Sequence, residues 1–322
     1  MEVAYLHAAE SAKGGIGGTL TIEDGTVLKA SYGVEFSNDY TINGGTIELS
    51  GGNAAGQLWG FVFQSGEYEI NSDIVIDGNA PLYFTYATAV VNSSITHASN
   101  GKNDVYINTY SDVTIAENGS LVSDGLIRVV DSAEFTVDGG SVSGKINNLG
   151  LMTVTGDAAV NAQFSGNGTL VIEDAVIDAA SSYTGSQNVI RFLGNNVIES
   201  GMDIDGRIYV GKMESDDEAD SFVPAAADLT IKDSMAVSEI FIGAQYKDGI
   251  PTDAEGNDIL SVVNVQNNST LVIDKHGGSG LAIRNSGVLN IEAGSTVSIK
   301  NDIAATIQGA INVYGTFTNT DL

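Results

Sequence analysis

Leu20-Thr-Ile22-Glu-Asp-Gly25-Thr-Val27 and Tyr40-Thr-Ile42-Asn-Gly-Gly45-Thr-Ile47 are two copies of one short phrase. Each copy has an apolar–polar–apolar run, then a turn of acidic, Gly or Asn residues, then a small residue before a further apolar one. Self-similarity at a period of about 20 residues predicts a stacked solenoid, in which each repeat covers its apolar face with the next repeat. Further copies begin at Tyr68, Val113, Phe135, Met152, Leu170, Leu229, Leu271, Leu289 and Ile311.

The distance between copies varies along the chain. Tyr68 and Val113 are 45 residues apart, and Leu229 and Leu271 are 42 apart, so we interpret each interval as two turns. Leu289 follows Leu271 by 18 residues, which we interpret as one turn. A coil whose loops differ in length tolerates this variation. A β-sandwich fits less well, because its strands recur every 8–12 residues or so without one repeated phrase.

The composition predicts a nearly all-β chain. Apolar residues make up 43% of the 322 residues, with 39 Gly and 3 Pro. Val, Ile, Thr and Tyr lie between clusters of Gly, Asn and Asp, a pattern typical of short strands joined by tight turns. No segment keeps an apolar helical period over three turns. We therefore predict one elongated β-solenoid domain over residues 1–322, with a lead-in over 1–13.

The charge balance excludes one class of partner. With 41 acidic against 13 basic residues the net charge is −28, whereas binding to nucleic acid requires clustered Lys and Arg. Attachment to an anionic membrane surface is disfavoured for the same reason. The first ten residues lack the features of a signal peptide, and no run of 18 apolar residues could span a membrane. An export signal would therefore lie outside this sequence. The chain has no Cys, so burial and backbone pairing must stabilise it.

Two aromatic segments allow two interpretations. Trp59, Phe61 and Phe63 alternate along one predicted strand and so share one face. The row is either a platform on which sugars stack or an aromatic stack inside the coil, and we favour the buried stack. The segment 81–86, which is also rich in aromatic residues, poses the same choice, and we favour the same answer.

Two polar stretches interrupt the repeat, at 212–228 and 246–259, and we predict that both are loops projecting from the solenoid. Such loops are candidate ligand contacts, with solvated loops without a ligand as the alternative. Their carboxylates are also the only candidates for a cofactor, which would be calcium, although neither stretch has the order of an EF-hand. The candidate contact residues are Glu214, Asp217, Phe222, Tyr246 and Asp253. The candidate calcium ligands are Asp216, Asp217, Asp220, Asp253, Glu255 and Asp258.

Motifs for catalysis or zinc binding are lacking. His7, His97 and His276 are far apart, and no nucleophile elbow is present. The abundant Asp and Glu leave open a carboxylate pair of a glycoside hydrolase. A lyase acting on acidic polysaccharides would need basic residues, and we interpret Arg128, Arg191, Arg207 and Arg284 as dispersed solubilising residues.

The phrases Leu20–Val27 and Phe135–Val142 resemble the passenger domains of bacterial autotransporters, of the pertactin-like and AIDA-like adhesin kind. The resemblance covers the chain from about residue 14 to its end. It implies a right-handed parallel β-helix, which we expect to have 12–15 coils, and display on the outer surface of a Gram-negative bacterium after export through the periplasm. It also implies a C-terminal barrel, which Thr318–Leu322 does not match. The chain would then be a passenger fragment or a secreted β-helix of another system.

Together these features predict a non-catalytic, adhesin-like surface protein that binds a glycan or protein on host or bacterial cells, or a second copy of itself. The alternative is a β-helix polysaccharide lyase or glycoside hydrolase that acts on extracellular glycans. No nucleic acid partner and no membrane-inserted segment are expected.

Overall fold

The computed structural model of the chain contains β-strands as its regular structure. The described residues form 28 strands, β1–β28, and include no helix, so none of them belongs to a helix that could cross a membrane. The all-β prediction is confirmed. The residues described are 2–9, 18–50, 60–77, 80–98, 103–177, 181–211, 226–244, 250, 252–274, 279–300 and 304–319.

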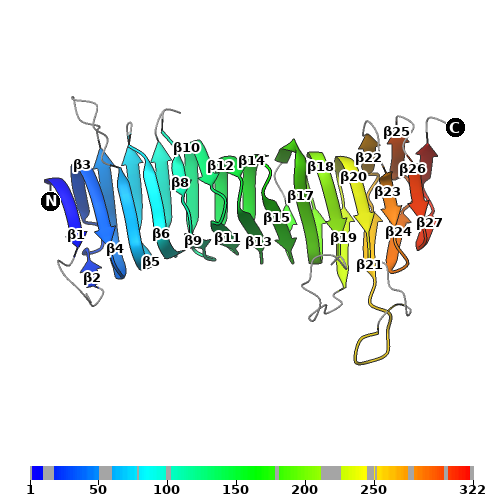
Figure 1. Cartoon of the computed structure of the whole chain (residues 1–322), viewed down its shortest axis with the longest axis horizontal. Helices are drawn as coiled ribbons and strands as arrows, with labels where there is room; N and C mark the ends of the chain where they lie inside the picture. The colour runs from blue at the N-terminus through cyan, green and yellow to red at the C-terminus, as the bar shows by residue number, and fades with distance from the viewer. Residues whose placement is uncertain are drawn as a thin grey trace. The chain divides into compact units, whose positions relative to one another are not determined.

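The chain forms two compact units. Unit 1 comprises Met1–Thr153 and Asp157–Gly168, and unit 2 comprises Val154–Gly156 and Thr169–Leu322. In both units the named strands pair in parallel, each with a strand further along the chain (Figure 1). The described strands therefore do not form the two facing antiparallel sheets of a β-sandwich.

Unit 1 has three columns of parallel strands. The first column runs through β1 (Glu2–Ala9), the end of β3 (Val27–Ser37), the starts of β5 (Phe61–Asp77) and β6 (Leu82–Val91), β8 (Val105–Ile107), the ends of β10 (Ser120–Val129) and β12 (Ser141–Asn148), and β14 (Ala159–Ser165). The second column runs through β2 (Gly18–Thr21), the start of β4 (Tyr40–Ser50), the middle of β5, the end of β6, β9 (Asp112–Ile115) and β11 (Glu134–Asp138). The third column joins the start of β3, the ends of β4 and β5, β7 (Ser94–Ala98), and the starts of β10, β12 and β14. Strand β13 (Leu151–Thr155) follows β12 in sequence.

Unit 2 also has three columns of parallel strands. The fourth column runs through the starts of β17 (Ser181–Ile198), β18 (Met202–Val210) and β20 (Ser234–Ile242), then β22 (Thr270–Asp274), β25 (Thr296–Lys300) and β28 (Thr316–Asn319). The fifth runs through β15 (Thr169–Glu173), the middle of β17, the ends of β18 and β20, β23 (Ser279–Ile283) and β26 (Ala304–Ile307). The sixth runs through β16 (Val176–Ile177), the end of β17, β19 (Ala227–Ile231), β21 (Ser261–Val265), β24 (Gly287–Ile291) and β27 (Ala310–Val313).

The columns correct part of the predicted repeat register. Leu229 pairs with Val263, and Val263 pairs with Leu289 in the sixth column, whereas Leu271 pairs with Met235 in the fourth. The interpretations of Leu229 to Leu271 as two turns and of Leu271 to Leu289 as one turn are therefore wrong. The physical reason is that successive strands of the chain enter different columns, and every column needs the same apolar alternation.

Elsewhere the predicted register is right or off by two residues. Tyr68 pairs with Ala89, which pairs with Val113, so this interval does span two pairings. Leu20, however, lies beside Ile42 rather than beside the first residue of the second phrase. A shift of two residues keeps the same side chains inward, because strand side chains alternate with a period of two.

The core of unit 1 contains a stack of phenylalanine rings. Phe36, Phe63 and Phe84 occupy paired positions of the first column. The Phe36 and Phe63 rings are stacked with centroids 5.6 Å apart, and those of Phe63 and Phe84 are 5.0 Å apart at 10°. Phe61 and Phe63 are fully buried, so the predicted interior stack is confirmed for both and neither can bind a sugar. Trp59 lies outside the described residues.

Amide side chains form ladders along the columns. In unit 1, Asn71 donates from Nδ2 to Asn43 Oδ1, and Asn92 Nδ2 donates to Asn71 Oδ1, both at 2.8 Å. In unit 2 the same bonds connect Asn290 to Asn264 at 2.7 Å and Asn312 to Asn290 at 2.8 Å. The amides other than the exposed Asn312 are half-buried, and each bond satisfies a neighbour, which removes the cost of burying an amide alone.

Candidate functional site

The outer face of the first column carries an ordered group of polar and aromatic side chains. We name it the tyrosine–arginine row, and its successive members occupy paired positions on β6, β8, β10, β12 and β14. The members on β6, β8, β10 and β12 have a buried residue on either side in their strands, and Ser165 follows the buried Phe164, so the alternation of the strands points them outward. The row consists of Tyr83, Tyr106, Arg128, Asn147 and Ser165.

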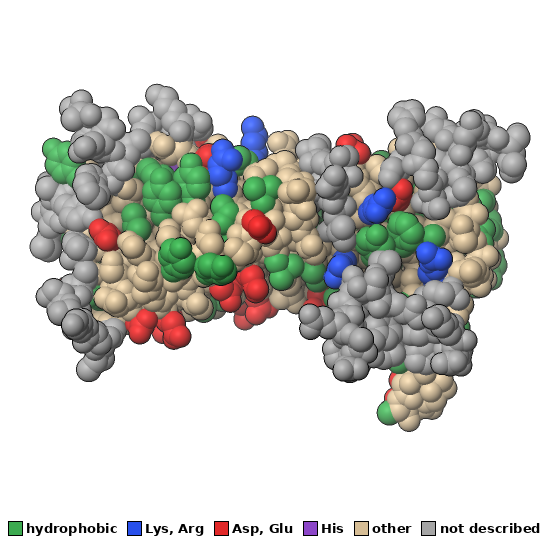
Figure 2. Space-filling view, viewed as in Figure 1, with side chains coloured by type: hydrophobic (Ala, Val, Ile, Leu, Met, Phe, Trp, Pro, Cys, Tyr) green, Lys and Arg blue, Asp and Glu red, His purple; other side chains and the backbone are tan. Residues whose placement is uncertain are grey.

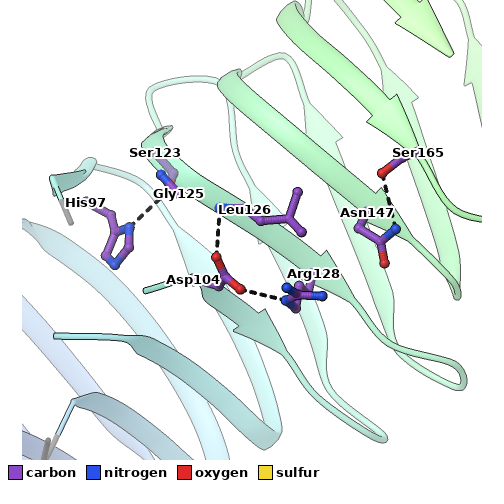
Figure 3. Close-up of polar contacts among 8 residues, drawn as sticks. All are labelled: His97, Asp104, Ser123, Gly125, Leu126, Arg128, Asn147 and Ser165. Atoms are coloured by element: carbon purple, nitrogen blue, oxygen red, sulfur yellow. Dashed lines mark hydrogen bonds and ion pairs between the residues drawn. The ribbon is translucent and has the colours of Figure 1, made fainter. Parts of the chain in front are cut away.

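Stacking orders the row. The rings of Tyr83 and Tyr106 have centroids 4.9 Å apart and an interplanar angle of 17°. The guanidinium carbon of Arg128 lies 6.0 Å from the centroid of Tyr106 on the next strand. Further along, Asn147 donates from Nδ2 to Ser165 Oγ at 3.1 Å (Figure 3). Because most ring faces are covered by a neighbour, the row presents ring edges, hydroxyls and the guanidinium to solvent.

Asp104 holds Arg128 in place. Arg128 Nε donates to Asp104 Oδ2 at 2.6 Å, and the Leu126 backbone N–H donates to Asp104 Oδ1 at 3.0 Å (Figure 3). The Asp104 side chain is 18% exposed and the Arg128 side chain 43%. The hydrogen bond with Asp104 is the largest cause that raises the pKa of Arg128, and a hydrogen bond with Tyr106 adds to it.

This arrangement leaves donors for a ligand. A guanidinium has five N–H donors in a rigid fork, and the bond to Asp104 uses one of them. The Nε bond to Asp104 also fixes the plane of the guanidinium before any ligand arrives. A pre-oriented, partly exposed Arg beside tyrosine hydroxyls is suited to bind a carboxylate together with neighbouring hydroxyl groups.

The sequence predictions for these residues were partly wrong. In segment 81–86, Phe84 is buried as predicted, but Tyr83 is half-buried and faces outward, and Tyr86 is 56% exposed. Arg128 is a surface residue, and the structure adds that it is bonded to Asp104 and lies against Tyr106. Aligning the apolar–X–apolar strands of successive repeats by their middle residue would have revealed the row.

A second feature of unit 1 is an open groove of about 570 Å³ over the second column. Asp39, Glu67 and Glu69 line it together with the ring of Tyr40, and the Glu67 backbone N–H donates to Asp39 Oδ1 at 2.8 Å. None of the described lining residues is basic. The groove is therefore unsuited to hold a uronate.

A buried His–Ser pair lies close to the row. His97 is 1% exposed, and one ring nitrogen lies 2.9 Å from Ser123 Oγ (Figure 3). The other ring nitrogen lies 3.0 Å from the Ala80 carbonyl oxygen. The carbonyl can only accept, so Nε2 carries the proton and Nδ1 accepts from Ser123. Ser123 Oγ also accepts from the Gly125 N–H at 3.2 Å. Burial closes this pair to any substrate, so its role is structural.

The predicted contact loops are described only in part. Glu214, Asp216, Asp217, Asp220, Phe222 and Tyr246 lie outside the described residues. Asp253, Glu255 and Asp258 are exposed in a turn closed by an antiparallel bridge between Thr252 and Asp258. Within the described part of the chain, no group of three or more acidic or His side chains is placed to hold a metal ion.

The Asp253 carboxylate makes hydrogen bonds within this turn. It accepts from the backbone N–H groups of Glu255 and Asn257, at 3.0 and 2.8 Å, and from Asn257 Nδ2 at 3.0 Å. The hydrogen bond with the Asn257 side chain is the largest cause that lowers the pKa of Asp253. The carboxylate thus organises the turn.

Arg128 and the stacked tyrosines lie together on an outer strand face of unit 1. Figure 2 shows that hydrophobic side chains gather on the viewed face of each unit, with Lys and Arg side chains close to them. Comparison of the chain with protein-family models, with curated proteins and with solved structures gave no match.

Proposed function

We propose that the chain is a right-handed parallel β-helix of 12–15 coils that serves as a non-catalytic attachment domain outside a bacterial cell. Six columns of parallel strands support the winding, and eight strands in the first column and six in each column of unit 2 suit that number of coils. The repeated phrases, the lack of Cys and the resemblance to autotransporter passengers support a single exported, elongated domain.

The observation that carries the proposal is the tyrosine–arginine row. Its tyrosines present ring edges and hydroxyls and have few rotatable bonds, and stacking on each other reduces the entropy lost when a ligand binds. Arg128 is aimed by Asp104 before binding. Attachment requires such a fixed, exposed surface and no reacting group.

The ligand that suits this surface is a glycan with a carboxylate. Arg128 and the neighbouring Lys145 on β12 supply the positive charge, and the tyrosine hydroxyls supply partners for sugar hydroxyls. A ligand with isolated carboxylates is favoured over a dense polyanion, because the net charge of −28 repels the latter over long range.

A glycan array tests the proposal. Wild-type chain is applied beside Tyr106→Ala and Arg128→Gln variants and beside a Tyr110→Ala control. Tyr110 is a matched control because it also contacts another tyrosine ring, that of Tyr86 at 6.1 Å, and is 72% exposed. We expect binding to glycans with terminal carboxylates that both row variants lose and the control keeps. Equal binding by all four proteins, or none by the wild type, would reject the row as the attachment surface.

One observation favours a catalytic alternative at the same place. A lyase on acidic polysaccharides needs a cation for the uronate and a group that takes its proton, and the guanidinium carbon of Arg128 lies 6.0 Å from the centre of the Tyr106 ring. Incubation with uronate polymers should then release unsaturated products that absorb in the ultraviolet, and Tyr106→Phe should abolish their release. Binding without product formation supports attachment.

A further inference from the structure

Unit 2 carries a group of side chains built like the tyrosine–arginine row. On β18 and β20, Arg207 pairs in register with Glu239, and two residues further Tyr209 pairs with Phe241. Residues two apart on a strand share a face, so the four side chains lie together on the outer side of the fifth column. We name them the arginine–aromatic cluster.

Its geometry repeats three features of the row. The rings of Tyr209 and Phe241 are stacked at 4.9 Å and 21°. Arg207 Nε makes an ion pair with the Glu239 carboxylate, as Arg128 Nε does with Asp104. The charge of Glu239 is the largest cause that raises the pKa of Arg207, and a hydrogen bond with Tyr209 adds to it.

Exposure shows which part of the cluster a ligand can reach. The Glu239 side chain is 4% exposed, whereas that of Arg207 is 53% exposed. The buried carboxylate therefore holds one edge of the guanidinium and leaves another edge toward solvent, beside the half-buried Tyr209 and Phe241. Arg191 pairs in register with Tyr209 on the other side and adds positive charge to the same row of positions.

Chance does not readily explain the repetition. The chain has four Arg, and two of them share an ion pair between Nε and a carboxylate from another part of the chain, together with a nearby pair of aromatic rings stacked at 4.9 Å. Solubility alone would not require a carboxylate partner or stacked rings, because a solvated Arg needs neither.

We infer that the arginine–aromatic cluster is a second binding site for a carboxylate-bearing sugar, so that one chain binds two such ligands. The inference rests on the proposed function for its ligand class. Arg207 holds the carboxylate through its exposed N–H groups, and Tyr209 and Phe241 contact the ring and hydroxyls of the sugar. Two sites on one chain increase the avidity for a surface that displays many copies of the sugar.

Side-chain NMR provides the test, because four Arg give four Nε–H signals. The full chain is labelled with 15N-arginine, its signals are assigned by single Arg→Lys variants, and 3′-sialyllactose is titrated against lactose as the matched sugar without a carboxylate. We expect saturable shifts of the Arg128 and Arg207 signals with sialyllactose and no saturable shift with lactose. The Arg284 signal, from outside both groups, should not move.

Variants separate the two sites. Tyr209→Phe should raise the dissociation constant measured from the Arg207 signal at least threefold and leave the one measured from the Arg128 signal unchanged. Tyr106→Phe should raise the constant measured from Arg128 and leave the one from Arg207 unchanged. Tyr314→Phe, at a tyrosine that is 78% exposed and belongs to neither group, is the control. Both Tyr→Phe changes keep the ion pairs, so the fold is retained.

The outcomes are distinguishable. Shifts confined to Arg128 would overturn the second site and leave the proposed function standing. Shifts at neither Arg would overturn both. Equal shifts with lactose would overturn the carboxylate-specific site, because the sugar would then be bound without its acid group. Parallel shifts of all four signals would overturn it too, because they indicate a non-specific effect of charge.

Discussion

Asp104 and Arg128 are 24 residues apart in sequence, yet Arg128 Nε lies 2.6 Å from Asp104 Oδ2. Parallel pairing of β8 with β10 brings them together, since Arg128 lies beside Tyr106, two residues after Asp104. The same carboxylate accepts from the Leu126 backbone N–H, where β10 changes from the third column to the first. One aspartate therefore fixes both a turn of the backbone and the orientation of the exposed arginine.

Replacing Asp104 should cost stability as well as binding. In Asp104→Asn the two accepted hydrogen bonds lose their charge assistance, so we expect the free energy of unfolding to fall by about 1–2 kcal/mol. Urea denaturation followed by circular dichroism measures this change. Asp131→Asn, at an exposed aspartate of the same unit, should stay within about 0.5 kcal/mol of wild type. Equal stability of both variants would show that Asp104 does not anchor the turn.

A substitution in the phenylalanine stack should lower the stability further. Phe63 is fully buried between Phe36 and Phe84, so Phe63→Ala should destabilise the chain by about 3–5 kcal/mol through lost contacts and a cavity. Val62, the preceding residue, is half-buried and faces outward, and Val62→Ala should cost less than about 1 kcal/mol. Similar losses in the two variants, measured by urea denaturation, would contradict the assignment of inner and outer faces.

Aspartate substituted at neighbouring positions of β9 tests which of its residues face the core. Ile115 is fully buried and its neighbour Thr114 is half-buried on the opposite face of β9. Ile115→Asp places an unpaired carboxylate among apolar side chains and should cost several kcal/mol, about 3 or more. Thr114→Asp leaves the new charge in water. If both variants melt at the wild-type urea concentration, Ile115 does not face the core.

Alternation was enough to predict the inward residues. In Phe61–Phe63 and in the phrases that begin at Tyr40 and Val113, every second residue is apolar, and a strand has no other way to bury them together. Register between strands was less predictable, as Leu271 and Leu289 show. Any column accepts the same apolar phrase, so similarity between two phrases does not reveal which of them pair.

The candidate site depended on register and was therefore missed. Tyr83, Tyr106 and Arg128 become neighbours only when three strands are aligned correctly. Arg207 and Glu239 are harder still, because the long insertion between β18 and β19 separates them in sequence. The net charge of −28 pointed away from arginine, although it says nothing about how four arginines are grouped.

Arg207 and Glu239 should be coupled in stability. Arg207→Ala removes a cation that is ion-paired with the buried Glu239 carboxylate, so we expect a loss of about 2–3 kcal/mol. Glu239→Gln in the same chain removes the buried charge and should restore part of that loss. A double-mutant cycle from urea denaturation measures the coupling. Additive effects of the two changes would mean that the ion pair contributes nothing, and Arg284→Ala serves as the control for loss of an arginine elsewhere.

His97 should make stability depend on pH in a defined direction. Burial is the largest cause that lowers its pKa below the usual 6.5, while the bond to Ala80 and the charges of Asp124 and Asp104 act the other way. A lowered pKa means that the unfolded chain binds the proton more readily, so stability is full above pH 6.5 and falls as the pH drops from there toward the folded-state pKa. One proton changes the free energy of unfolding by at most about 1.4 kcal/mol per pH unit.

The control for this pH effect is His97→Gln, whose amide can still donate and accept hydrogen bonds but does not titrate. Many carboxylates titrate in the same range, so the quantity to compare is the difference between wild type and variant in urea denaturation at pH 7.5 and pH 5.5. We expect wild type to lose more stability than the variant on acidification, because protonated His97 would turn Nδ1 into a donor opposite a serine that already accepts from Gly125. Parallel pH profiles would show that His97 binds its proton alike in the folded and the unfolded chain. The buried pair with Ser123 would then contribute no pH dependence.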